Sequence, residues 1–122
     1  MTKFEYNGAT LHLLYNGYAY FELGKLFPDE SIVDVVRRGD LKELSVIAAR
    51  LIEEGEAVRR ARGLEAQSPI SADELLRCTS PKQALALHAA VFAEILEGIS
   101  REELDTSEPE DMTLMKMNKK KE

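Results

Sequence analysis

The sequence is poor in the features that mark secreted and membrane-spanning proteins. Its 122 residues include one cysteine, Cys78, so no disulfide can form within the chain. No apolar run approaches the roughly 20 residues that a membrane-spanning helix needs. The first residues lack the apolar core of a signal peptide, because Glu5, Asn7 and Gly8 interrupt them. These absences predict a cytoplasmic protein with no membrane partner.

Positive charge is also scarce. Sixteen Lys and Arg residues stand against 22 Asp and Glu, which gives a net charge of −6. Because such a protein repels phosphate backbones, we expect no nucleic-acid partner. The hydrophobic fraction of 44% is enough for a core, and the length fits one domain.

Residue patterns that carry catalysis or bind cofactors are missing as well. Neither His12 nor His88 has an acid or thiol at a recognised metal-ligand spacing. Cys78 at a helix end would suit an activated thiol, but a small buried residue is the favoured interpretation. Glu53 and Glu54 are adjacent on a helix, so they diverge by about 100° and predict a solvated edge. With no glycine-rich phosphate loop either, we expect neither enzyme activity nor a cofactor or metal.

What is present begins with a β-hairpin. The pair Asn7-Gly8, which a tight type I′ turn prefers, separates two short segments of alternating polarity. In the return strand Leu11 and Leu13 face one side and His12 the other. A two-stranded hairpin is marginal in water, so we expect it to pack on helices.

Apolar residues at three- and four-residue steps then predict helices over 17–27, 30–38, 41–62, 72–78 and from 81 onward. Each follows a residue suited to cap a helix N-terminus: Asn16, Asp29, Asp40, Ser71 and Ser80. The fold class is therefore mainly α, a small helical bundle with an N-terminal β-hairpin. Residues 1–104 form the domain, and 105–122 lack apolar periodicity and are predicted to be a disordered charged tail.

The apolar positions also predict which sides of the helices are buried. In the first helix the expected inward residues are Ala19, Tyr20, Leu23, Leu26 and Phe27. In the last helix the expected stripe is Leu85, His88, Phe92, Ile95 and Ile99, widened by Ala84, Leu87 and Val91. We expect Gly55 to bend the long helix or to let another helix approach closely, and Gly98 to mark fraying. We also expect Glu56 to pair with Arg60.

Two groups of side chains are candidates for binding a partner. Tyr18 and Phe21 lie off the inferred buried face of their helix, and exposed aromatic residues are favoured interface anchors. A hairpin that covers both is equally compatible with the sequence. Arg59, Arg60 and Arg62 end the long helix, where cations suit the helix dipole. A solvated face is favoured there over a site for an acidic partner.

The order of these elements carries a resemblance. After the hairpin come an aromatic helix, Tyr15-Asn-Gly-Tyr-Ala-Tyr-Phe-Glu-Leu-Gly-Lys-Leu-Phe27, and a long helix with Leu51-Ile-Glu-Glu-Gly-Glu-Ala-Val-Arg-Arg60. With the Ser-Pro-initiated helix, they resemble the small tail assembly chaperones of long-tailed bacteriophages and prophages over about residues 1–100. The resemblance implies a helical, non-enzymatic protein that binds the tape measure protein and tail-tube subunits in the host cytoplasm during virion assembly. It also implies a longer frameshifted form, with which the codons for Asn118 and Lys119 to Lys121 are compatible.

Two other classes stay open. The chain could be a small helical adaptor or regulatory domain, although a transcription factor would need a recognition helix, and only the three arginines come close. A small enzyme using Cys78 or His88 is the other class, which thiol-reactivity and activity assays would distinguish. The sequence leaves the oligomeric state open, a homo-oligomer included.

Overall fold

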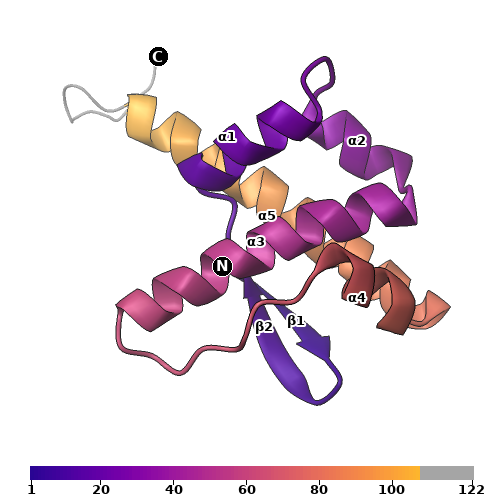
Figure 1. The fold of residues 1–122 in the computed structure, drawn as a ribbon. Coiled ribbons are helices and arrows are strands. Elements are labelled where there is room, and N and C mark those ends of the chain that lie inside the picture. The colour runs from indigo at the N-terminus through magenta and orange to yellow at the C-terminus, as the bar shows by residue number, and fades with distance from the viewer. Residues whose placement is uncertain (108–122) are drawn as a thin grey trace.

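The computed structural model describes the backbone of residues 1–107 and the side chains through Arg101. It confirms the predicted fold class, a mainly helical protein with an N-terminal antiparallel hairpin (Figure 1). The elements in chain order are β1 (Thr2–Tyr6), β2 (Ala9–Leu13), α1 (Gly17–Leu26), α2 (Ile32–Arg38), α3 (Leu41–Ala61), α4 (Ala72–Cys78) and α5 (Pro81–Ser107).

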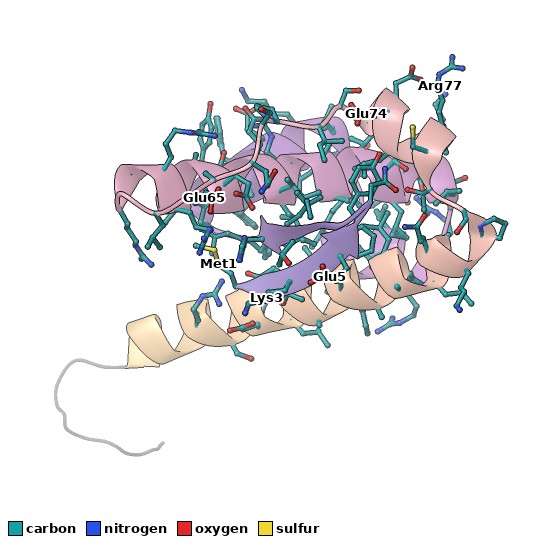
Figure 2. All side chains as sticks on the ribbon, turned by 90° about the horizontal axis from the view of Figure 1, so that it is seen from below. Met1, Lys3, Glu5, Glu65, Glu74 and Arg77 are labelled. Carbon is teal, nitrogen blue, oxygen red and sulfur yellow. The ribbon has the colours of Figure 1, made fainter. Side chains whose placement is uncertain are left out.

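The hairpin lies between the two long helices, with β2 against α3 and β1 against α5 (Figure 2). Asn7 and Gly8 have φ angles of 48° and 84°, as the predicted type I′ turn requires. One face of the hairpin is buried in the core and includes Leu11 and Leu13. The core is therefore enclosed by α3, α5 and the inner face of the hairpin.

Strand β2 runs directly against the backbone of α3 at Gly55. A Cβ atom on Gly55 would lie 2.0 Å from the carbonyl oxygen of His12, a distance that no side chain can occupy. One turn before Gly55 in α3, the carbonyl oxygen of Leu51 accepts a hydrogen bond from the N–H of Leu14, just after β2, at 3.0 Å. Gly55 therefore admits a close neighbour, as expected, but the neighbour is a strand.

The signals for helix starts are confirmed with one exception. In four predicted N-caps the side-chain oxygen accepts the backbone N–H three residues on: Asn16, Asp40, Ser71 and Ser80. The predicted cap at Asp29 is wrong, because a turn at 27–30 precedes α2 and its N-cap is Ser31.

Helix α5 buries most of the predicted stripe: Ile95 is fully buried, and Phe92 and Ile99 pack against the core. Leu87 and Val91 are fully buried, whereas Leu85 is 74% exposed, so the assignment of Leu85 to the core is wrong. The expected fraying at Gly98 is also wrong, because α5 packs closely against Tyr15 there. A Cβ atom added to Gly98 would lie 2.7 Å from the carbonyl oxygen of Tyr15. The helix continues to Ser107, three residues past the predicted domain boundary, and 108–122 lie outside the described residues.

We expect the close approach at Gly55 to make Gly55→Ala strongly destabilising. The added methyl group would push β2 away from α3, and overpacking of this kind costs about 1–3 kcal/mol or more of unfolding free energy. Gly24→Ala in α1 is the matched control, since a Cβ there meets nothing within 4 Å. That change should be neutral or stabilise by about 0.5–1 kcal/mol. Urea unfolding of both variants would contradict this packing if Gly55→Ala were as stable as the parent.

Candidate partner-binding surface

Helix α1 exposes several large apolar side chains. Tyr18 and Phe21 are each 57% exposed, so the hairpin does not cover them. Tyr20 and Leu26, expected in the core, are exposed to 59% and 57%, so their assignment to the buried face is wrong. Single exposed apolar residues are ordinary on a protein surface, but a cluster on one short helix marks a candidate interaction site.

A narrow contact with α3 explains this exposure. Only Ala19 and Leu23 of α1 are buried. The side-chain amide of Asn16 donates to Glu54 of α3 at 3.1 Å, while its oxygen accepts from the N–H of Ala19 at 2.9 Å. Glu54 is 9% exposed, so the solvated edge predicted for Glu53 and Glu54 is wrong for Glu54. Asn16 thus fixes the start of α1 and leaves most of the helix surface facing solvent.

An apolar groove of about 590 Å³ lies beside α1. Its walls come from α1, the loop at the top of Figure 1, the start of α2, and one residue of α5. Most lining side chains are aromatic or aliphatic, among them Tyr20, Phe21, Phe27, Ile32, Val33 and Ile99. Concave sites with this lining accept apolar groups of a ligand or partner.

Cationic side chains hold the two candidate anchors without covering them. The ammonium of Lys25 lies 4.5 Å from the ring centroid of Phe21, and the guanidinium of Arg50 lies 5.8 Å from that of Tyr18. Such contacts contribute about 0.5–1 kcal/mol at exposed sites. Phe21 therefore belongs to the groove, whereas Tyr18 lies toward α3.

Two of the three arginines at the end of α3 form hydrogen bonds within the chain. Arg59 donates two hydrogen bonds to the carbonyl of Glu65, at 3.2 and 2.9 Å, and Arg60 donates to the carbonyl of Gln67 at 3.1 Å. Both therefore hold the loop that follows α3. Arg62 is exposed beside them. A role for these arginines in partner binding stays a prediction.

The expected ion pair of Glu56 with Arg60 is wrong, because α3 turns Glu56 inward toward β2. Glu56 is 2% exposed, and its carboxylate accepts hydrogen bonds from the backbone N–H groups of His12 and Gln67, each at 2.8 Å. The Nδ1 atom of His12 lies 3.0 Å from the same carboxylate. Burial raises the pKa of Glu56, but the hydrogen bonds from Gln67 and His12 outweigh burial and hold the pKa below its ordinary value.

The remaining chemically reactive side chains are dispersed. His88 at the edge of the core bonds the carbonyl of Val36 at 2.8 Å through Nε2. Cys78 is exposed, so the interpretation of a small buried residue is wrong. Burial, with Cys78 and Glu74 nearby, raises the pKa of Tyr6 to about 12. Within residues 1–101, no three His, Cys, Asp or Glu side chains are grouped to hold a metal ion.

Comparison with known proteins found no relative of this chain. No protein-family model, curated protein or solved structure matches this chain. The resemblance to tail assembly chaperones therefore rests on the sequence segments quoted above. None of the helices in the described part of the chain combines the length and apolar character needed to cross a membrane.

We expect acidification to weaken the contact between the hairpin and α3. Because the folded-state pKa of Glu56 is below its ordinary value of 4.5, its carboxylate stabilises the fold fully above that pH. This contribution is lost as the pH falls through the folded-state pKa. Below pH 4.5 the parent should therefore lose unfolding free energy more steeply than Glu56→Gln, measured by urea unfolding at each pH. The exposed Glu53→Gln should keep the parent's slope, and equal slopes for all three proteins would contradict this role of Glu56.

Proposed function

We propose that this protein is a non-enzymatic assembly chaperone that binds an apolar helical segment of a partner through α1 and the adjacent groove. The proposed partners are the tape measure protein and tail-tube subunits of a long-tailed bacteriophage or prophage, in the host cytoplasm. The class of partner rests on the family resemblance. The observation that carries the binding function is the exposed aromatic helix beside a groove of about 590 Å³.

The groove suits the apolar face of an amphipathic helix. Helices of this kind bind by placing side chains three and four residues apart into a hydrophobic groove. A tape measure protein is long, and its apolar helical faces are exposed until the tail tube encloses them. A chaperone that covers such faces prevents their aggregation. The net charge of −6 favours a segment with flanking basic residues and adds solubility to the complex.

The proposed interface is largely formed before the partner arrives. Tyr20 is held edge-on to the ring of Tyr15, with centroids 6.4 Å apart, and Phe21 is held by Lys25. Binding therefore costs little side-chain ordering. A small groove with few anchors gives modest affinity, which suits a chaperone that must release its partner.

We expect the double change Tyr18→Ser and Phe21→Ser to weaken binding while leaving the fold intact. Both side chains are more than half exposed, so the free energy of unfolding should change by less than about 1 kcal/mol. Capture of a candidate tape measure protein that the parent binds should fall at least about tenfold, the effect of losing one good anchor. Phe21→Ser should account for most of the loss because Phe21 lines the groove.

A co-expression pull-down with circular dichroism melts measures both effects. Leu64→Ser is the control, since Leu64 is 49% exposed but lies in the loop after α3. A stable double variant that captures the partner normally would remove this surface from the proposal. If the parent captures neither the tape measure protein nor the tail-tube subunit, the chaperone proposal itself fails, and an adaptor for another partner becomes the better account.

A further inference from the structure

Helix α5 carries a second apolar surface, separate from α1. Leu85 is 74% exposed and Leu96 is 45% exposed, so no other element of the described chain covers them. From Leu85 to Leu96 the exposed side of α5, here called the α5 face, is uncharged, and the exposed Glu97 follows it. It consists of Leu85, Ala86, Ala89, the partly exposed Phe92, Ala93 and Leu96. Exposed surfaces of this kind on a soluble protein mark interaction sites.

The spacing on the α5 face is that of a seam between paired helices. Leu85, Ala89, Phe92 and Leu96 follow one another at steps of four, three and four residues, which keeps them in line along a helix. Only Phe92 of these four also packs against the core of its own chain. The seam is therefore available to a second helix over about 17 Å, at 1.5 Å per residue.

We infer that the α5 face pairs with the α5 face of a second copy of this chain, with the two helices antiparallel. In this alignment Leu85 lies opposite Leu96 of the second copy, and Ala89 lies opposite Phe92. Each large ring then meets a methyl group rather than another ring, which fills the space without overlap. The small flanking residues Ala86 and Ala93 let the helices approach closely.

The distribution of charge along α5 favours a second copy of the chain as the partner and an antiparallel pairing of the two helices. From Pro81 to Phe92 the only charged residue is Lys82. After Leu96 the helix sequence is mainly acidic, with Glu97, Arg101, Glu102, Glu103 and Asp105. Glu94 adds nothing to this face because it is fully buried. The helix dipole adds positive potential at the first end and negative potential at the second. Antiparallel pairing places unlike ends together, whereas parallel pairing would place the acidic halves side by side.

The size of the α5 face predicts a weak dimer. About three helical turns bury roughly half of the ~800 Å² per partner of a standard protein interface. We therefore expect a reversible, concentration-dependent dimer with a Kd on the order of 10 μM or weaker. The inference does not depend on the proposed function, because the α5 face includes no residue of α1.

Sedimentation velocity over a range of concentrations tests the association. The parent should sediment as a 13.7 kDa monomer when dilute and approach twice that mass when concentrated. Leu85→Glu with Leu96→Glu should remain monomeric, since both side chains are exposed and the fold does not need them. The control Leu64→Glu, equally exposed but on the loop after α3, should associate like the parent. A parent that is monomeric throughout, or a double variant that associates like the parent, would overturn the inference.

Disulfide cross-linking tests the direction, and it remains informative if the glutamate variant fails to fold. Cys78 is exposed, so Cys78→Ser provides the background. In that background, Leu85→Cys combined with Leu96→Cys in one chain should oxidise to a covalent dimer, and each single variant should do so far less. Efficient cross-linking of Leu85→Cys alone would show parallel pairing and overturn the antiparallel arrangement.

Discussion

One buried carboxylate joins three parts of the chain that are far apart in sequence. Glu94, in the middle of α5, is fully buried. It accepts hydrogen bonds from the N–H and hydroxyl of Thr2 at 3.1 and 3.0 Å and from the N–H of Tyr15 at 2.9 Å, and it pairs with Arg101 at 2.9 Å. A carboxylate without such partners would be very costly to bury. The two ends of the hairpin segment and α5 must therefore assemble together.

Glu54 and Glu56, both on α3, contact the same hairpin segment from the side opposite to α5. Glu56 accepts a hydrogen bond from the backbone N–H of His12, and Glu54 accepts one from the side-chain amide of Asn16. Residues 2–16 thus lie between two long helices that each present buried acids to them, and α1 begins at the end of this segment. The position of the proposed binding surface follows from these contacts, because α1 itself contributes only two buried side chains. Polar contacts with the backbone thus orient an aromatic helix that buries little of its own surface.

Local features of the fold were predictable, and contacts between distant residues were not. Asn7-Gly8 and the helix caps act within a few residues, so the sequence alone identifies them. The sequence analysis placed Glu54 on a solvated edge and paired Glu56 with Arg60, because their partners Asn16 and His12 lie 38 and 44 residues away. Periodicity predicted the buried side of α5 at Leu87, Val91 and Ile95 but could not exclude Leu85, which is also apolar and begins the predicted stripe. The exposure of Tyr18 and Phe21 was one of two outcomes equally compatible with the sequence. The groove could not be predicted, because it combines side chains from α1, α2 and α5.

The dependence of the fold on Glu94 is tested most directly by the unfolding free energy of Glu94→Gln, measured in urea beside Glu97→Gln. Glu97 lies one turn away and also pairs with Arg101, but its side chain is 51% exposed. Breaking a buried ion pair typically costs about 3–5 kcal/mol, whereas exposed substitutions usually stay within about 0.5 kcal/mol. We therefore expect Glu94→Gln to lose at least about 3 kcal/mol and Glu97→Gln to match the parent. Equal stability of the two variants would contradict the central role of the buried carboxylate.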